Sequence, residues 1–232
     1  MRQQIVVFSG AGISKESGLS TFRNNDGVWS KYNPDVVATP QGFEANTEES
    51  LQFYNERRLA LAKAVPNHAH IVLANLAEKH DVTIITQNVD DLHERAGSKN
   101  VIHLHGELKK VTSSLNRLNK DCIKELPLDT PIRIGDLASD GSQLRPFIVM
   151  FGEYLSNMTD AVRIVKNADI FLVIGTSLKV YPANQLVKYP HHEVPRFIID
   201  PDKVNVPDGY IHIKETATKG IDIFIEEIDK LL

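Results

Sequence analysis

A glycine-rich segment near the amino terminus carries the clearest chemical signal in this sequence. An apolar run of strand length, residues 5–8, leads directly into Gly10-Ala11-Gly12. Gly10 permits a tight turn, and Gly12 lets the backbone approach a pyrophosphate at the N-terminus of the next helix. Dehydrogenases that bind dinucleotides have a third glycine three residues after the second, but Lys15 stands at that position here. The segment therefore predicts a dinucleotide site that does not belong to an ordinary dehydrogenase.

A cluster of carboxamide and carboxylate side chains follows a second apolar run. Gln87, Asn88 and Asp90 come directly after residues 82–86. Open α/β sheets bind their ligands at the carboxyl ends of their strands, which is where these side chains would lie. Asn88 or Asp90 could instead only cap the helix that runs to Arg95. Capping explains one of the three residues, so the pattern favours a ligand site.

Two histidines, His103 and His105, stand just before Gly106. Residues two apart in an extended chain share a face, so both side chains could point into one cleft. A metal site would need further ligands at metal spacing, and none stands nearby in the sequence. A histidine at the end of a strand that faces a nucleotide crevice is a candidate general base, because its pKa lies near the working pH.

Two later segments add polar groups to the same region. Gly175-Thr176-Ser177 follows an apolar strand, and its hydroxyls and free N–H groups suit ribose or phosphate oxygens. Residues 147–151 form another apolar run, which Gly152 and Glu153 follow. An edge strand with a turn accounts for this second segment when it is taken alone.

Short apolar runs alternate with helical patterns, and these elements must position the chemical groups. The runs are nearly continuous, which is typical of parallel strands that are covered on both faces. We therefore predict an α/β fold with a Rossmann-like parallel sheet and helices on both faces. The predicted strands are 5–8, 82–86, 101–104, 169–175 and 197–200, and the predicted helices are 67–80, 156–167 and 221–232.

The 232 residues suit a single domain with a small insert. The segment from Glu107 to Leu144 is polar and weakly periodic, and structureless loops of that length are uncommon inside a compact domain. We therefore predict a small inserted subdomain with short elements of its own. The large part is expected at about 1–32, 66–106 and 145–232, and the small part at about 33–65 and 107–144.

The charge balance and the cysteine content exclude several classes of function. Lys and Arg total 26 against 30 Asp and Glu, so the net charge of -4 predicts no nucleic-acid partner and no anionic membrane partner. The chain has no apolar run of membrane-spanning length and no signal-peptide pattern, so a cytoplasmic location is expected. A single cysteine, Cys122, rules out an internal disulfide and a cysteine-based zinc site.

Taken together, these motifs resemble those of the sirtuins, the NAD-dependent protein-lysine deacylases. The resemblance spans Gly10 to Ala217, with the motifs in the order and spacing of the family: GAGIS, GLSTFR, TQNVD, HG, FGE and GTSLKVYPA. Residues 26–29, 37–43 and 54–57 are similar to bacterial members and to relatives that remove acidic acyl groups. The resemblance implies that NAD and acylated-lysine proteins or peptides bind to this chain.

The resemblance also implies which residues hold NAD as a co-substrate. The glycine segment would hold the pyrophosphate, residues 87–90 the nicotinamide end, and residues 176–177 the adenosine half. Ile198 stands where the family usually has an asparagine that contacts the adenosine, so Asp200 is expected to hydrogen-bond the ribose instead. The implied NAD-binding residues are Gly10, Ala11, Gly12, Ser14, Phe22, Arg23, Trp29, Gln87, Asn88, Val89, Asp90, Gly175, Thr176, Ser177, Asp200 and Ala217.

His105, rather than His103, matches the catalytic base of the family. It would take a proton from a ribose hydroxyl after the acyl oxygen has displaced nicotinamide, and the products would be nicotinamide, lysine and O-acyl-ADP-ribose. Residues 151–153 would pair with the peptide as an added strand. Tyr54 and Arg57 fit the Tyr-x-x-Arg motif of relatives that remove malonyl, succinyl or glutaryl groups, whose carboxylate suits a guanidinium fork. The implied substrate-binding residues are Ala38, Tyr54, Arg57, Phe151, Gly152 and Glu153.

The family pattern is incomplete at a second place, and other functions remain open. Most sirtuins hold a structural zinc with two cysteine pairs, but Lys109–Ser114 stands where the first pair is expected, so we expect no zinc and no other metal. The acyl motif predicts a preference for succinyl- over acetyl-lysine, with deacetylation as a secondary activity. An NAD glycohydrolase and a non-catalytic NAD-sensing module are the alternatives. The peptide-binding segment argues against the first, and an intact His105 argues against the second.

Overall fold

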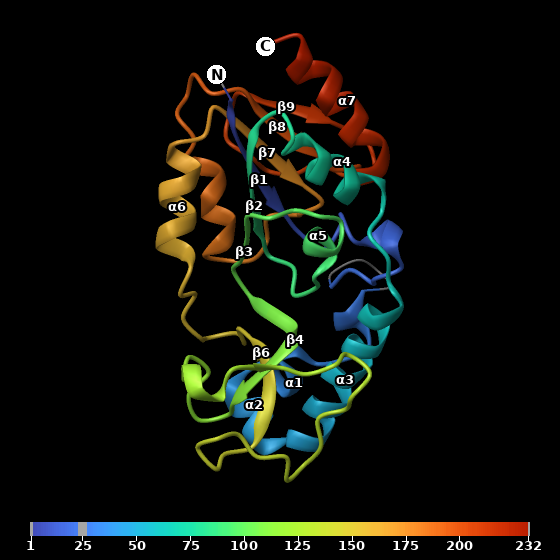
Figure 1. Cartoon of the computed structure of the whole chain (residues 1–232), viewed down its shortest axis with the longest axis vertical. Coiled ribbons are helices and arrows are strands. Elements are labelled where there is room, and N and C mark those ends of the chain that lie inside the picture. Colours follow the sequence, from blue (N-terminus) through green and yellow to red (C-terminus); the bar gives the residue numbers. More distant parts are fainter. Residues whose placement is uncertain (1, 23–26, 232) are drawn as a thin grey trace.

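The computed structural model describes residues 2–22 and 27–231, and the upper half of the molecule in Figure 1 is a six-stranded parallel sheet. Its strand order is β3-β2-β1-β7-β8-β9, so the order reverses beside β1, which pairs with β2 on one side and with β7 on the other. Open sheets bind ligands at such reversal points. The strands are β1 (Gln4–Ser9), β2 (Asp81–Thr86), β3 (Val101–His103), β7 (Ile170–Ile174), β8 (Arg196–Ile199) and β9 (Tyr210–Ile213).

Helices cover both faces of this sheet, because successive residues of a strand point to opposite sides. Ile5 and Val7 of β1 pack in one buried cluster with α4 and α7, whereas Val6 and Phe8 pack in another with α6 and η4. The covering helices are α4 (His68–Leu76), α6 (Met158–Lys166), α7 (Ala217–Asp229) and the 3₁₀ helix η4 (Ala183–Lys188). The predicted α/β fold is confirmed.

Most of the predicted elements form, with bounds that differ by a few residues, and α7 and β9 show the main differences. α7 begins at Ala217 rather than at Ile221. Its first four residues, 217–220, precede the strongly apolar part of the helix, so the apolar pattern does not predict them. β9 is absent from the sequence prediction, because Tyr210–Ile213 is a short edge strand with mostly half-exposed side chains and no continuous apolar run.

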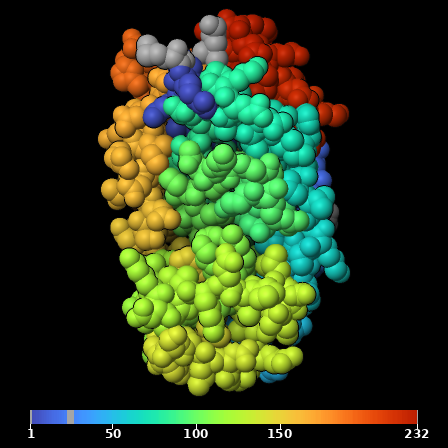
Figure 2. Space-filling model, viewed as in Figure 1, coloured from blue at the N-terminus to red at the C-terminus, as the bar shows by residue number. Residues whose placement is uncertain are grey.

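The lower half of Figure 1 is built on an antiparallel sheet of three strands in the order β5-β4-β6. Three helices pack against it, and the buried cluster between them includes Phe43, Leu51, Leu108 and Val111. In Figure 2 the chain between β5 and β6, coloured yellow-green, covers most of the lower end of the visible face. The elements are α1 (Pro34–Val37), α2 (Pro40–Ala45), α3 (Thr47–Lys63), β4 (Gly106–Ser113), β5 (Lys124–Glu125) and β6 (Leu144–Ile148).

Two polar side chains of α3 tie down the chain that follows β5. The guanidinium of Arg58 is fully buried and donates to the carbonyl oxygens of Leu108, Leu126, Pro127 and Thr130. One helical turn earlier, Asn55 donates to the carbonyl of Ile132 at 2.9 Å and accepts from its N–H at 2.9 Å. Long-range hydrogen bonds to α3 therefore hold a segment that has little regular structure of its own.

The remaining elements of the described chain are short helices. They are η1 (Lys15–Ser17), η2 (Val28–Ser30), α5 (Leu92–Arg95) and η3 (Lys120–Cys122). The helix expected after the glycine segment is thus the single 3₁₀ turn η1. No helix in the described part of the chain is long and apolar enough to cross a membrane.

Candidate active site

One large cavity, of about 650 Å³, begins at the reversal point of the parallel sheet and reaches the antiparallel sheet. At one end its wall contains the glycine segment and the residues that follow β7. At the other end its wall contains Phe53 and Tyr54 of α3 and the turn after β6, residues 149–153. The cavity therefore joins the predicted nucleotide site to the predicted acyl-peptide site.

The glycines are required where the loops after β1 and β7 meet. The N–H of Gly10 donates to the carbonyl of Ile174 at 3.0 Å, and that of Gly12 donates to the carbonyl of Gly175 at 2.7 Å. A Cβ on Gly10 would lie 2.6 Å from Cβ of Thr176, and one on Gly12 would lie 2.7 Å from Cα of Gly175. Larger residues would push the two loops apart, so the glycines set the shape of the cavity floor.

The loop that follows β2 presents two carboxamides to the cavity. Gln87 accepts a 2.8 Å hydrogen bond from the hydroxyl of Thr176, while its buried Nε2 has no partner among the described residues. Asn88 donates from Nδ2 to the carbonyl of Gly10 and to the hydroxyl of Ser14, both at 3.2 Å. The acceptor Oδ1 of Asn88 and the donor Nε2 of Gln87 are thus available to a ligand.

Asp90 lies behind this loop rather than in the cavity wall. Its carboxylate accepts from the hydroxyl of Ser14 at 3.0 Å and from the N–H of Leu92, the first residue of α5, at 3.2 Å. Burial raises the pKa of Asp90 to about 6. Asp90 therefore caps α5, which was the structural alternative, and at the same time braces the Ser14 hydroxyl that contacts Asn88.

The two histidines have different surroundings. His105 lines the cavity, and its Nδ1 lies 2.9 Å from the carbonyl oxygen of Gln87. Because a carbonyl can only accept, Nδ1 carries the proton and Nε2 keeps the lone pair that a base needs. Burial lowers the pKa of His105, so its ring is neutral at pH 7.

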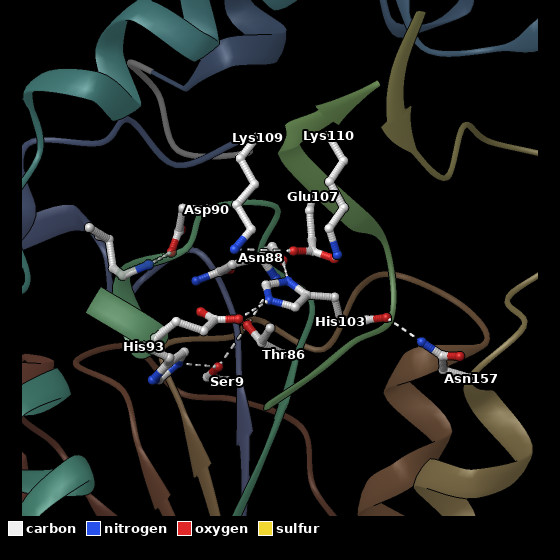
Figure 3. Close-up of polar contacts among 12 residues, drawn as sticks. Ser9, Thr86, Asn88, Asp90, His93, His103, Glu107, Lys109, Lys110 and Asn157 are labelled. Carbon is white, nitrogen blue, oxygen red and sulfur yellow. Dashed lines mark hydrogen bonds and ion pairs between the residues drawn. The ribbon is translucent and has the colours of Figure 1, made fainter. Parts of the chain in front are cut away.

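His103 points away from this cavity, towards Glu94 and Glu107, and Figure 3 shows it beside Glu107. It lines a separate cavity of about 250 Å³. The expectation that both histidines could face one cleft is therefore wrong. The reason is that β3 ends at His103, so the extended geometry that places alternate residues on one face does not continue to His105.

The acyl end of the cavity contains Tyr54 but not Arg57. Tyr54 and Ala38 line it, and burial raises the pKa of the Tyr54 hydroxyl, which therefore stays protonated. Arg57 lies just outside, with its guanidinium 5.8 Å from the centre of the Phe53 ring, and its buried Nε has no partner within residues 2–22 and 27–231. Phe53 thus separates the Arg57 charge from the cavity.

Aromatic rings close the same end. Trp29 lies between three of them, with ring centres 5.3 Å from Phe22, 5.7 Å from Phe53 and 6.3 Å from Phe151. All four rings line the cavity, and Phe151 is partly exposed at its rim. They exclude water from the region where the two ends of the cavity meet.

The turn after β6 is held from several sides. The apolar run 147–151 is a strand only as far as Ile148, the last residue of β6. Beyond it, the N–H of Val149 donates to the carbonyl of His105 and that of Phe151 to the carbonyl of Ala38, both at 2.8 Å. The carboxylate of Glu153 accepts from Arg145 and from the N–H of Met150, and it lies 3.5 Å from Arg117. The Glu153 side chain is therefore an anchor of the turn, and the N–H groups of Val149, Phe151 and Glu153 are themselves bonded within the protein.

A match to a family model decides the family. The model described as "Sir2 family" matches residues 10–182. This chain belongs to the Sir2 family. An NAD-dependent protein deacylase of Bacteroides thetaiotaomicron is 48% identical over 99% of this chain and 98% of its own length. A solved Sir2 homologue–NAD complex has a TM-score of 0.83 and 36% identity, and covers 98% of this chain and 90% of that one. A solved Sir2–p53 peptide–NAD+ complex has a TM-score of 0.78 and 30% identity, over 97% and 93%.

The predicted sirtuin identity and enzyme class are confirmed by these matches, and the cavity of this sirtuin brings together most of the predicted residues. Gly10, Ser14 and Asp90 stand behind its wall, Arg57 lies outside it, and Arg23 is not among the described residues. The predicted residues that line it are Ala11, Gly12, Phe22, Trp29, Ala38, Tyr54, Gln87, Asn88, Val89, His105, Phe151, Gly152, Glu153, Gly175, Thr176, Ser177, Asp200 and Ala217.

The nucleotide end of this sirtuin also contains charged residues for which the sequence predicts no role. Lys15, Glu16, Lys179 and Lys203 line the cavity as well. Glu16 accepts hydrogen bonds from Thr216 and Thr218 at the start of α7, at distances of 2.6–3.1 Å. No sequence signal could have paired groups 200 residues apart in the chain.

The donor set of this end suits NAD. The glycines leave room for phosphate and ribose oxygens close to the backbone, the Thr176 and Ser177 side chains line the same end, and Nε2 of Gln87, unpartnered among the described residues, adds a buried donor. Ile198 is buried inside the sheet, whereas Asp200 reaches the cavity, where burial raises its pKa.

Proposed function

We propose that this Sir2 chain is an NAD-dependent protein-lysine deacylase that prefers acidic acyl groups, such as succinyl or malonyl, over acetyl. Its products are nicotinamide, free lysine and O-acyl-ADP-ribose, and its substrates are acylated-lysine proteins of the cytoplasm. The observation that carries the proposal is the single cavity, which contains the glycine segment, His105 and Tyr54 in one continuous wall.

The residues at the nucleotide end bind and orient NAD. When bound, NAD supplies the reactive C1′ of its nicotinamide ribose. The glycine segment and Thr176 hold the pyrophosphate and ribose oxygens, and Asp200 and Ala217 hold the adenosine half. Asn88 and Gln87 bind the nicotinamide carboxamide and its ribose, because one offers a free acceptor and the other a free donor.

His105 is the general base in this proposal. Its Nδ1–H donates to the Gln87 carbonyl, which fixes both the tautomer and the orientation of the ring. Burial keeps the ring neutral, so Nε2 can accept the proton of a ribose hydroxyl. The aromatic rings of Phe22 and Trp29 keep water away while the glycosidic bond is open.

Tyr54 and Arg57 select the acyl group. The cationic group of Arg57 lies over Phe53, whose ring is part of the cavity wall, and its Nε has no partner to give up. A rotation of the Arg57 side chain around Phe53 brings the guanidinium to a carboxylate at the end of an acyl chain, beside the Tyr54 hydroxyl. Ala38 leaves room for the longer chain.

The proposal includes the absence of a zinc ion. The only thiol, Cys122, is buried in the apolar cluster of the lower half, and Arg58 and Asn55 hold the segment after β5. Metal analysis of the purified protein should therefore find no stoichiometric zinc, and a chelator should leave the unfolding temperature unchanged. One zinc per chain would contradict this part of the proposal.

Nicotinamide release tests the function. The protein is incubated with NAD, with and without a succinyl-lysine peptide. Release that depends on the peptide supports a deacylase. Release without the peptide would instead indicate an NAD glycohydrolase, and NAD binding without release would indicate a sensor.

A further inference from the structure

We propose that His103 and Glu94 form a charged positioning pair that fixes the nicotinamide-binding loop, residues 87–90, in its catalytic shape. The inference rests on the proposed function, because it assigns a role beside the proposed NAD site. It concerns two residues that touch neither NAD nor the acyl peptide in that proposal.

The contacts of His103 define its charge. Nδ1 lies 3.0 Å from the carbonyl oxygen of Asn88 (Figure 3), and Nε2 lies 2.8 Å from Oε1 of Glu94. A carbonyl and a carboxylate can only accept hydrogen bonds, so both ring nitrogens must donate. Only the imidazolium form of histidine has two N–H groups. The buried ring is therefore a cation that links the Asn88 backbone to α5, which carries Glu94.

The two histidines together hold two consecutive carbonyls of the loop. His105 donates to the carbonyl of Gln87, and His103 donates to the carbonyl of Asn88. From the other side, the N–H of Asn88 donates to the hydroxyl of Thr86 at 3.0 Å. The N–H and the carbonyl of Asn88 are thus both hydrogen-bonded, which fixes its backbone. Its Nδ2 can then stay bonded to the carbonyl of Gly10 and the hydroxyl of Ser14, and its Oδ1 is left for a ligand.

The other charged groups around His103 do not neutralise the pair. Glu107 of β4 is engaged by Lys110 at 2.5 Å and by Lys109 at 3.8 Å (Figure 3). Asp90 and His93 are the titratable neighbours on the sheet side, and Arg117 and Asp160 line the small cavity with His103. The Glu94 carboxylate is thus the hydrogen-bonded counter-ion of the ring.

The same neighbours argue against a metal ion here. Glu94, His103 and Glu107 bring their ligand atoms within 4.8 Å of one another, which would suit a cation. Binding would require His103 to lose a proton and Glu107 to lose its lysine partners. Two ammonium groups beside the site would also repel a metal.

The pair gives the reaction a distinctive pH dependence. Burial lowers the pKa of His103, but its hydrogen bond to Glu94 and the Glu94 charge outweigh burial and leave that pKa raised. The pair is therefore intact at low pH and is lost as the pH rises through the raised value. His105 has the opposite requirement, because it must be neutral and its pKa is lowered. His105 therefore sets the acid limb of the activity profile, and His103 sets the alkaline limb.

Glu94→Gln tests the pair, with Glu78→Gln as the matched control at an exposed glutamate. Glu94→Gln keeps the size and one acceptor but removes the negative charge. We expect the alkaline limb of kcat/KM for NAD to move to lower pH. We also expect roughly a tenfold loss of kcat/KM for NAD above neutral pH, with KM for the acyl peptide unchanged. Glu78→Gln should match the wild-type protein.

Histidine side-chain NMR provides a readout without turnover. In the wild-type protein, both nitrogens of His103 should be protonated at pH 7, and Glu94→Gln should lower its titration midpoint. A neutral His103 at pH 7, or an unchanged alkaline limb in Glu94→Gln, would overturn the inference. Failure of the wild-type protein to consume NAD with any acyl peptide would overturn the proposed function instead, while the NMR titration would still decide the charge of His103.

Discussion

The two halves of this molecule are stabilised by different interactions. In the parallel-sheet half, β1 is buried on both faces, with Ile5 and Val7 against one helical layer and Val6 and Phe8 against the other. In the antiparallel-sheet half, an apolar cluster is supplemented by Arg58, whose buried guanidinium holds four carbonyl oxygens. The first half is stabilised by apolar packing, whereas the second adds the hydrogen bonds of a buried guanidinium to its apolar packing.

This difference places chemistry and stability on separate residues. His105 and the loop beside it lie on the parallel-sheet side of the cavity, outside the apolar clusters that cover the sheet. Arg57 and Arg58 are neighbours on α3, yet one faces the cavity wall and the other the core. Changes at these positions should separate activity, specificity and stability.

The largest effect is expected for His105→Ala. Removal of a general base commonly lowers the rate by roughly 10²–10⁴-fold, and the apolar core of the parallel sheet is untouched. Peptide deacylation should fall by that factor, while NAD affinity in a calorimetric titration and the unfolding temperature stay near wild type. Near wild-type turnover would show that another group is the base.

Arg58→Met should cause the largest loss of stability. The change leaves four buried carbonyl oxygens without their donor, so the free energy of unfolding should fall by about 3–5 kcal/mol. Urea denaturation measures the change, and Arg57→Met is the matched control, since it should cost far less. Equal losses in the two variants would contradict the separate roles of these neighbours.

Arg57→Met should instead change specificity. Loss of the guanidinium should weaken transition-state binding of a succinyl-lysine peptide by about 2–4 kcal/mol in kcat/KM. Deacetylation, which has no carboxylate to pair, should be spared. Equal losses on both peptides would assign Arg57 a structural role, and the preference for acidic acyl groups would then have no basis.

Asp90→Asn should stabilise the protein above pH 6. The pKa of Asp90 is raised to about 6, so the folded state binds its proton more tightly than the unfolded chain does. The free energy of unfolding of the wild-type protein therefore falls by about 1–3 kcal/mol as the pH rises from about 4 to above 6. The asparagine variant has no charge to bury and avoids this loss. Thermal unfolding at pH 5 and pH 8 measures it. A variant less stable than wild type at pH 8 would show that the capping contact to Leu92 outweighs the cost of burying the charge.

Local sequence patterns were sufficient for the parallel sheet and for most of the cavity wall. Continuous apolar runs such as residues 170–174 mark buried strands, and the residues that follow such strands must meet at one edge of the sheet. The same logic misses β9, whose side chains are mostly half-exposed. The division of the chain into a large part and a small insert at the stated boundaries stays a prediction.

The orientation of individual side chains depends on contacts that no local pattern contains. Whether Arg57 or Arg58 faces the core is decided by carbonyls up to 72 residues away, at Thr130. The separate surroundings of His103 and His105 depend on where β3 stops and on the position of Glu94. Spacing could identify these residues as important but not assign their partners.

The most direct test of the central claim is to identify the product formed from NAD. The protein is incubated with NAD and a succinyl-lysine peptide, and the products are measured by mass spectrometry. We predict one O-succinyl-ADP-ribose for each lysine released, at a higher kcat/KM than an acetyl-lysine peptide gives. Plain ADP-ribose that forms at the same rate with and without peptide would contradict the account.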